Sequence, residues 1–307
     1  MTQMHVLVTG GAGFIGSHSV EAILDDGALV TVLDNFSSGK HTNLPRHPRL
    51  KIIDDDMRDT SAVDQALVGG SHVLHLAAQV SVPASVADPL GSSEHNIRGF
   101  LNVLDGARRA KVRRFVYASS AAVYGAPKCL PLDEASTVAP LSPYGLEKSI
   151  NDQYAALYRQ LYELSSLGLR YFNVYGPRQD PSSPYAGVIS RFAAAMKNGE
   201  DLRVFGDGAQ TRDFIFVKDV AQVNLNALKK SVTGVCNIAT GKSVTLLELI
   251  ETLAKCTVCT SHIRHEPPAP GDIRHSSAIP LKMLEQLDPP AMTTLADGLK
   301  QLLESSA

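Results

Sequence analysis

The amino-acid sequence predicts an α/β fold, a doubly wound parallel sheet with a smaller C-terminal lobe. From residue 4 to about residue 175, short apolar strand-like runs alternate with segments whose apolar residues recur at helical spacing. This alternation is typical of a parallel sheet covered by helices. After residue 173 the elements become shorter and are interrupted by Gly176-Pro177 and by the proline-rich run 267–271. The 307 residues, 44% of them hydrophobic, are enough for two lobes with ample cores.

The first strand is predicted over residues 6–9, and three spaced glycines follow it at once, Gly10, Gly13 and Gly16. Apolar residues then recur at helical spacing. In such a turn the backbone can approach a pyrophosphate, and the N-terminus of the helix offers N–H groups and a positive dipole end to that anion. The second strand leads into Asp34, about twenty residues on, where a carboxylate would meet an adenosine ribose. The stretch therefore predicts a Rossmann-like dinucleotide site, and Asp34 favours NAD over NADP.

The remaining strands of the predicted sheet follow in order, at residues 29–33, 51–54, 72–76, 115–118 and 169–173. Two long helices are expected at 89–110 and 143–167, each with an apolar stripe. We expect residues 1–173 to form the NAD-binding domain, with roughly 214–240 returning to it, and residues 174–307 to form a substrate-binding lobe.

Two of these strand ends are suited to the cofactor. Asp56 follows the third strand, where its carboxylate could accept from the adenine amino group. A solvated acidic strand end is an equally good interpretation of Asp56. The fourth strand ends in Ala77 and Ala78, which are small enough to let the dinucleotide lie close to the backbone.

Composition excludes several classes of protein. The formal net charge of −2 and the lack of a basic run argue against nucleic acid as the main partner, and no apolar run approaches the roughly 20 residues of a membrane span. The first strand begins too early to leave room for a signal peptide. Cys256 and Cys259 have the spacing of half a zinc site, but Cys129 and Cys236 form no second pair, so no metal is expected. A reducing cytoplasm is the expected location.

The candidate chemistry lies around Tyr144 and Lys148, which are four residues apart at the start of the second long helix and so share a face. A nearby ammonium and a positive nicotinamide ring would lower the phenol pKa from about 10, which would make Tyr144 a base for a sugar hydroxyl. Ser120 follows the fifth strand, whose carboxyl end should lie beside the nicotinamide. Its hydroxyl could hold or relay the proton.

These motifs together resemble the extended short-chain dehydrogenase/reductase family, and within it the NAD-dependent UDP-hexose 4-epimerases. The resemblance is carried by the glycine loop, Ser120, the Tyr144 and Lys148 pair and the runs 170–177, 206–214 and 217–220. The motifs occur at matching places along nearly the whole chain, and jointly they are specific.

The resemblance implies a catalytic trio of Ser120, Tyr144 and Lys148. It implies cofactor contacts from Gly10, Gly13, Phe14, Ile15, Gly16, Asp34, Asn35, Ser38, Gly39, Asp56, Met57, Leu76, Ala77, Ala78, Asn96, Tyr144, Lys148 and Tyr171. It implies substrate contacts from Ser120, Tyr144, Asn173, Val188, Val204, Phe205, Arg212, Asp272 and Ser276. Among these, Phe205 with Val204 would pack the uracil, and Asp272 would bind the uridine ribose.

Arg212 would bind the pyrophosphate, a role that suits a permanently charged bidentate donor. The alternative is a surface salt bridge from Arg212 to Asp207 or Asp213. The family often has a basic residue where this chain has Ala269-Pro270, so one diphosphate contact is either missing or supplied by Arg264 or Arg274.

The resemblance also distinguishes activities within the family. Dehydratases and decarboxylases carry an acidic residue soon after the serine, whereas this chain has Ala121 and Ala122. We therefore expect a UDP-sugar 4-epimerase that acts on UDP-glucose and UDP-galactose. Ser276 stands where a bulky tyrosine narrows the sugar pocket of similar enzymes, so the N-acetylated sugars should also fit. A homodimer through the two long helices is implied as well, although their apolar stripes could equally be intrachain core.

Three alternatives remain open. UDP-glucuronate 4-epimerase would use the same machinery with a different pocket at C6 of the sugar. Another NAD-dependent enzyme that modifies nucleotide sugars is the second. The third is a non-catalytic NAD sensor, which Tyr144 and Lys148 argue against.

Overall fold

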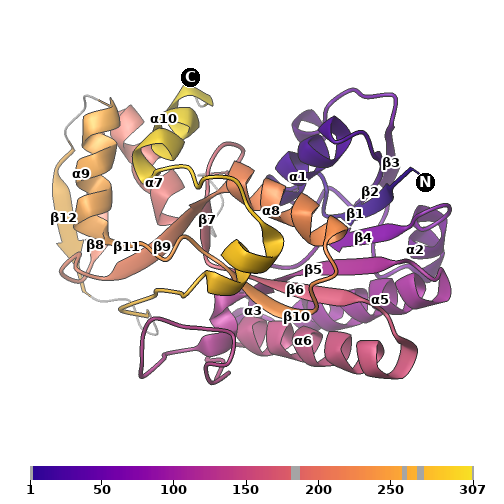
Figure 1. The fold of residues 1–307 in the computed structure, drawn as a ribbon. Coiled ribbons are helices and arrows are strands. Elements are labelled where there is room, and N and C mark those ends of the chain that lie inside the picture. The colour runs from indigo at the N-terminus through magenta and orange to yellow at the C-terminus, as the bar shows by residue number, and fades with distance from the viewer. Residues whose placement is uncertain (1–2, 181–186, 258–260, 268–272, 306–307) are drawn as a thin grey trace.

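The computed structural model describes residues 3–180, 187–257, 261–267 and 273–305. Its main body is a seven-stranded sheet in which every strand pairing is parallel (Figure 1). The strand order is β10-β6-β5-β4-β1-β2-β3. The strands are β1 (His5–Thr9), β2 (Leu29–Asp34), β3 (Leu50–Asp54), β4 (His72–His75), β5 (Arg114–Ser120), β6 (Ser166–Tyr171) and β10 (Gly234–Ile238). The predicted doubly wound parallel sheet is confirmed.

Helices cover both faces of this sheet. On one face lie α1 (Phe14–Asp25) and α8 (Val217–Lys229), and on the other lie α2 (Thr60–Ala66), α5 (Phe100–Arg109) and α6 (Pro143–Tyr162) (Figure 1). Because both faces are covered, the inner strands read as continuous apolar runs rather than alternating ones. Val6, Leu7 and Val8 of β1 are all buried, on opposite sides of the sheet. The apolar runs of the sequence therefore correspond to the centre of the molecule.

The two long helices differ in detail from the expectation. The segment predicted as one helix over 89–110 consists of α4 (Pro89–Ser93), a π-helical turn η2 (Glu94–Gly99) and α5. The helix predicted over 143–167 ends at Tyr162, because Glu163 adopts the left-handed conformation with φ of 56° and stops the hydrogen-bond ladder. The strand predicted from residue 169 accordingly begins earlier, at Ser166.

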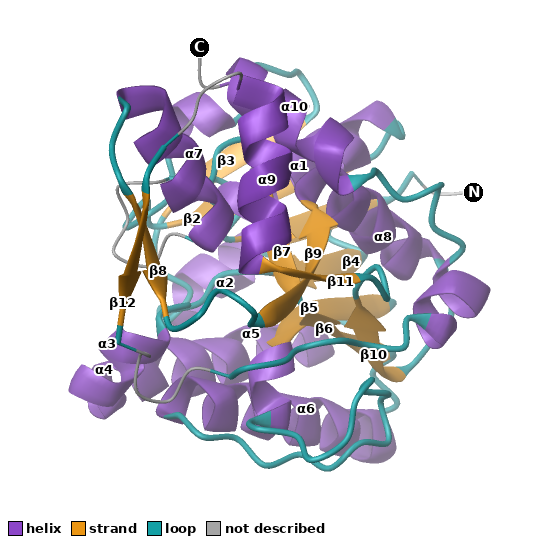
Figure 2. Cartoon of the chain, turned by 90° about the vertical axis from the view of Figure 1, so that its left-hand side faces the viewer, coloured by secondary structure: helices purple, strands orange, loops and turns teal. Residues whose placement is uncertain are grey.

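The second lobe has its own core and its own small sheets (Figure 2). A three-stranded sheet joins β11 (Ser243–Thr245), β9 (Thr211–Phe216) and β7 (Asn173–Tyr175), and β12 (Ile263–Glu266) pairs with β8 (Leu202–Phe205). Its helices are α7 (Val188–Asn198), α9 (Leu246–Thr257) and α10 (Leu295–Ser305). The predicted strand 169–173 thus divides, since β6 ends at Tyr171 and β7 begins two residues later in another sheet.

The topology determines where a ligand can bind. The chain builds β1, β2 and β3 towards one edge and then returns across β1 to build β4, β5 and β6 towards the other. Strand order therefore reverses between β1 and β4, and the crevice at their carboxyl ends is the usual ligand site of such a sheet.

The remaining short helices are η1 (His41–Asn43), α3 (Val82–Ala87), η3 (Ala121–Tyr124) and η4 (Met283–Leu287). None of the helices in the described part of the chain is long and apolar enough to cross a membrane.

Candidate active site

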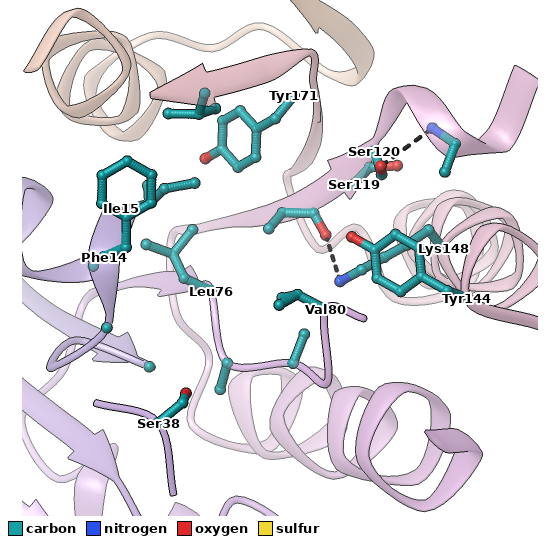
Figure 3. Close-up of a pocket in the computed structure, with 18 of the residues that line it drawn as sticks. Phe14, Ile15, Ser38, Leu76, Val80, Ser119, Ser120, Tyr144, Lys148 and Tyr171 are labelled. Carbon is teal, nitrogen blue, oxygen red and sulfur yellow. Dashed lines mark hydrogen bonds between the residues drawn. The ribbon is translucent and has the colours of Figure 1, made fainter. Parts of the chain in front are cut away.

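A cavity of about 1140 Å³ opens at the carboxyl edge of the sheet, between β1, β4 and β5 and the second lobe. One part is lined by the glycine loop and the end of β2, and another by Ser120, Tyr144 and Lys148. Figure 3 shows side chains from both parts around one space, with Phe14 and Ile15 across from the tyrosine and lysine of α6. The switch point of the sheet and the candidate chemistry therefore coincide.

The glycine loop has the close packing that a dinucleotide cradle requires. A Cβ atom on Gly10, whose φ is +68°, would lie 2.7 Å from the backbone nitrogen of Ala77, and one on Gly16 would clash with the carbonyl of Gly10. Gly13 is the N-cap of α1 and offers no side chain to bond the first N–H groups of the helix. The chain therefore brings bare backbone and a helix N-terminus to the cavity, which fits the pyrophosphate of NAD.

Asp34 braces this loop and also faces the cavity. One carboxylate oxygen accepts from the backbone N–H of Ala12 at 2.8 Å, and the other accepts from that of Phe36 at 2.9 Å. The side chain is mostly buried but still lines the cavity. A carboxylate held at the end of β2 fits a ribose hydroxyl pair and would repel the 2′-phosphate of NADP.

Asp56 also reaches the cavity, held at the end of β3. Its carboxylate accepts from the Arg58 guanidinium at 2.9 and 2.8 Å and from the Asn35 amide at 2.9 Å. The hydrogen bonds from Arg58 hold the pKa of Asp56 well below its usual range. Asp56 is therefore an ionised acceptor on the cavity wall, as an adenine contact would need.

Most of the predicted site residues line this one cavity. They are Gly10, Gly13, Phe14, Ile15, Gly16, Asp34, Asn35, Ser38, Gly39, Asp56, Met57, Leu76, Ala77, Ala78, Ser120, Tyr144, Lys148, Tyr171, Asn173, Arg212 and Ser276. They come from segments spread over more than 260 positions of sequence, between Gly10 and Ser276.

Four predicted residues are not brought to the cavity wall. The Asn96 side chain is used internally, because its amide oxygen accepts from the Gln79 backbone and its nitrogen donates to Glu147. Val204 is fully buried in the core of the second lobe. Phe205, beside it on β8, and Val188, at the start of α7, also lie away from the cavity lining.

Asp272 lies outside the described residues, as do Ala269 and Pro270.

The catalytic candidates are positioned by the start of α6 and the end of β5. Ser142 caps α6 by accepting from the Gly145 N–H at 3.1 Å, which places Tyr144 in the first helical turn. One turn further, the Lys148 ammonium donates to the Ala118 carbonyl at 3.0 Å and lies 5.8 Å from the centroid of the Tyr144 ring. The hydroxyl of Ser120 accepts from the N–H of Ala122 at 3.2 Å and lies on the same side of the cavity (Figure 3).

The pKa values of the two α6 groups shift in opposite directions. Burial lowers the pKa of Lys148 to about 8. Burial raises the pKa of the Tyr144 phenol, while the Ser120 hydroxyl acts in the lowering direction. In the chain alone, desolvation of the phenolate outweighs the lowering effect of Ser120, so the pKa of Tyr144 is raised. The expected lowering, which also relies on the positive nicotinamide ring, stays a prediction.

The second lobe contributes polar groups at the other side of the cavity. Arg212 donates to the Thr211 carbonyl at 2.9 Å, and the Asn173 amide donates to the Asp213 carbonyl at 3.1 Å. Asp207 pairs with Arg274 at 2.7 Å, so the alternative in which Asp207 is the partner of Arg212 is not what the structure has. Asp213, the other alternative partner, is buried and accepts from Thr240 and Gly241.

Sequence reasoning missed several lining residues. Val80, Leu141 and His275 line the cavity, and Val80 and Leu141 are largely exposed. Arg178 directly follows the run 170–177 that carried the resemblance, so that motif was the available signal for it. Loop residues such as Leu141 have no periodic pattern to mark them.

Among the described residues, no group of three or more His, Cys, Asp or Glu side chains could hold a metal ion.

The fold and the site define a dinucleotide-binding enzyme of the Rossmann type with a serine, a tyrosine and a lysine at its reacting end. Residues 6–239 match the model of the NAD dependent epimerase/dehydratase family, and the chain belongs to that family. Its cofactor is NAD, and the glycine loop and Asp34 fit that group. The chain is accordingly an NAD-dependent epimerase, an isomerase.

Individual relatives are similar over their whole length. The chain is 36% identical to a UDP-glucose 4-epimerase of Mycolicibacterium smegmatis, covering 98% of each chain. A UDP-N-acetylglucosamine 4-epimerase from Methanobrevibacter ruminantium, solved with UDP-N-acetylmuramic acid, is 39% identical with a TM-score of 0.96, over 100% of this chain and 99% of that one. A UDP-glucose 4-epimerase of Thermus thermophilus in complex with NAD is 37% identical with a TM-score of 0.91, over 98% of each chain.

Proposed function

We propose that this enzyme is a UDP-sugar 4-epimerase that interconverts UDP-glucose and UDP-galactose, and also UDP-N-acetylglucosamine and UDP-N-acetylgalactosamine. The observation that carries the proposal is the meeting of Ser120, Tyr144 and Lys148 with the NAD cradle in one cavity. The identity of 36–39% to 4-epimerases of UDP-sugars supports it.

The chain's own residues supply the proton chemistry. Tyr144 takes the proton from the 4-hydroxyl of the sugar, and Ser120 hydrogen-bonds the same oxygen. The Lys148 ammonium stabilises the phenolate of Tyr144 through its charge. NAD, when bound, supplies the hydride acceptor for C4 and later the hydride donor.

Inversion requires the transient 4-keto sugar to present its other face. We infer that the sugar swings about its pyrophosphate linkage inside the cavity of about 1140 Å³, which it would share with NAD. Arg212, on the lining, is the candidate that holds the pyrophosphate during this movement. Ala121 and Ala122 also line the cavity and bring no carboxylate, so the site favours redox at C4 over elimination or decarboxylation.

The proposal for the N-acetylated sugars rests on Ser276. Its side chain lines the cavity, and its backbone N–H donates to the Thr211 carbonyl at 3.1 Å, so the residue is fixed to the second lobe. A serine at this point leaves space that a larger side chain would fill. A 2-acetamido group is the substituent this space would accept.

We also propose that the enzyme is a homodimer that pairs through α5 and α6. On α6, Leu157 and Leu161 are 45% and 58% exposed, and Leu146 is 51% exposed. A shallow groove beside them is lined by residues of η2, α5 and α6, among them Ile97 and Leu101. Helical residues with this exposure and periodicity are typical of an interface between subunits.

Sedimentation equilibrium tests the dimer. Leu157→Glu with Leu161→Glu should convert it to a folded monomer, whereas Leu247→Glu, which replaces a 42% exposed leucine on α9, should leave it unchanged. A wild-type protein that sediments as a monomer at micromolar concentration would refute the dimer.

Proton NMR of the products tests the function. Purified protein is incubated with UDP-glucose, UDP-N-acetylglucosamine or UDP-glucuronate without added NAD. The C4 epimers of the first two should appear, since a cofactor that returns oxidised after each cycle need not leave. A reaction with UDP-glucuronate alone would replace this proposal by the uronate 4-epimerase. No epimer from any of the three, with NAD bound, would leave another nucleotide sugar or a sensor role.

A further inference from the structure

Helix α6 carries a buried carboxylate that the proton chemistry above does not use. One oxygen of Asp152 accepts from Nε and Nη2 of Arg170 at 3.1 and 3.0 Å, and the other accepts from the Tyr117 hydroxyl at 3.1 Å. The side chains of Asp152 and Arg170 are only 9% and 6% exposed. Burying such a pair costs desolvation that its attraction barely offsets. Stability alone is therefore a weak reason for this pair.

Asp152 lies one helical turn beyond Lys148, and both side chains are directed at the same strand. Residues four apart share a face of a helix. The Lys148 ammonium donates to the carbonyl of Ala118, and the Asp152 carboxylate accepts from Tyr117, the preceding residue of β5. An ammonium and a carboxylate are thus held on one face of α6, both turned towards residues of β5, in an interior where opposite charges attract strongly.

Among the residues that the structure describes, β4 and β6 bring no further anion to Lys148. His75, on β4, is fully buried, and burial lowers its pKa to about 3, so it is neutral at physiological pH. On β6 the charged group is Arg170, which is a cation and is already paired with Asp152.

The second carboxylate of α6 is turned elsewhere. Glu147 accepts from the Ser92 hydroxyl at 2.8 Å and from the Asn96 amide at 2.6 Å, in the direction of α4 and η2. Burial lowers the pKa of Lys148, and Asp152 opposes this more strongly than Glu147 does. Because Glu147 is bonded towards α4 and η2 while Asp152 shares the helix face of Lys148, Asp152 is the carboxylate of α6 that faces the ammonium.

Arg170 is itself fixed from the far side. Its Nη1 donates to the Tyr124 hydroxyl at 2.9 Å, its guanidinium lies 4.9 Å from the centroid of the Tyr124 ring, and that hydroxyl donates to Asn237 at 2.6 Å. Burial raises the pKa of Asp152, and the Arg170 guanidinium opposes that shift. The network anchored on β10 thus supports the ionised form of Asp152.

We propose that Asp152 is a positioning residue of the epimerase, a buried counterion held by Arg170 that keeps the Lys148 ammonium charged beside Tyr144. Asp152 does not contact the substrate and acts only through Lys148. The inference rests on the proposed catalytic role of Lys148.

Asp152→Asn tests this, because it removes the charge at nearly constant volume. The alkaline limb of the pH profile of kcat should move about one pH unit lower than in the wild type, the size expected for loss of one nearby opposite charge. The matched control is Asp219→Asn, which neutralises another buried carboxylate, on α8 and outside the cavity, that is bonded to Thr293. In the control the limb should stay in place. An equal loss of kcat at every pH in Asp152→Asn, with the limb unmoved, would make Asp152 merely structural and overturn the proposal.

A second variant covers a failure to fold. Asp152→Leu with Arg170→Met replaces the buried pair by apolar side chains, which proteins often tolerate. The same shift of the alkaline limb is expected.

A measurement that needs no turnover separates this inference from the proposed function. Titration of the Lys148 side chain by nitrogen-15 NMR, its signal assigned by loss in Lys148→Met, should give a lower pKa in either variant. An unchanged Lys148 pKa would refute the role of Asp152, whichever substrate the enzyme accepts.

Discussion

The ammonium of Lys148 lies 5.8 Å from the centroid of the Tyr144 ring and is fixed there by the carbonyl of Ala118. Burial disfavours the charged form of both side chains, raising the pKa of the phenol and lowering that of the ammonium. Because the ammonium lies only 5.8 Å from the centre of the ring, a charge on either group can stabilise the opposite charge on the other. A phenolate that forms at Tyr144 gains from the charge of Lys148, which is itself buried.

Removal of the Tyr144 hydroxyl should abolish most turnover and spare the cofactor. Tyr144→Phe keeps the half-buried ring but loses the proposed general base, so kcat should fall roughly 10²- to 10⁴-fold. The NAD content of the purified variant, measured after denaturation, should equal that of the wild type. A Tyr144→Phe enzyme with near wild-type kcat would show that another group takes the proton.

The pH dependence of kcat should show an alkaline limb. Because the pKa of Lys148 is about 8, its ammonium is present below that pH and is lost as the pH rises through it. The rate that depends on the charge should therefore decline above about pH 8. In Lys148→Arg the cation stays charged throughout this range, so kcat is lower but the limb near pH 8 should disappear. A limb that persists in Lys148→Arg would belong to a different group.

Ser276→Tyr should separate the two classes of sugar. The larger side chain would project into the cavity and compete with a 2-acetamido group, and overpacking of about 1–3 kcal/mol corresponds to roughly 5- to 150-fold. We expect kcat/KM for UDP-N-acetylglucosamine to fall by that factor, while the value for UDP-glucose changes little. The matched variant Ser276→Ala should leave the ratio of the two values unchanged. Equal losses for both sugars in Ser276→Tyr would contradict the role of Ser276.

The glycine loop can be tested by a single methyl group. In Gly16→Ala the added Cβ would clash with the carbonyl of Gly10, so the loop must shift. A cost of about 1–3 kcal/mol would weaken NAD binding roughly 5- to 150-fold, which is measured as NAD retained after gel filtration. The control is Gly199→Ala, where the φ of +68° strains the backbone but nothing lies within 4 Å. Gly199→Ala should lose some stability but keep its NAD. A retained cofactor in Gly16→Ala would argue against a tight cradle.

The parts that the sequence predicts best are those determined by local chemistry. The loop from Gly10 to Gly16 and the spacing of Tyr144 and Lys148 are short-range patterns whose geometry follows from backbone conformation and helical repeat. Asp34 could be placed for the same reason, since it ends the strand that follows the loop.

What could not be predicted depends on contacts between distant segments. The π-helical turn η2 interrupts a helix that the periodicity predicts as continuous, and it places Asn96 against Gln79 and Glu147 instead of at the cavity. The ion pair of Asp152 with Arg170 joins a helix to a strand, and nothing in the spacing of the two residues marks it. Val204 reads as a site residue by resemblance, yet tertiary packing places it in the core of the second lobe.

The central claim is that the hydride removed from C4 returns to C4 from the same retained cofactor. UDP-glucose with deuterium at C4 of the sugar tests it directly, with purified enzyme, no added NAD and analysis of the product by NMR and mass spectrometry. The account predicts UDP-galactose that keeps the deuterium at C4, because the label never exchanges with water. Product that has lost the deuterium to solvent would contradict the account, since C4 would then invert by proton exchange rather than by hydride transfer.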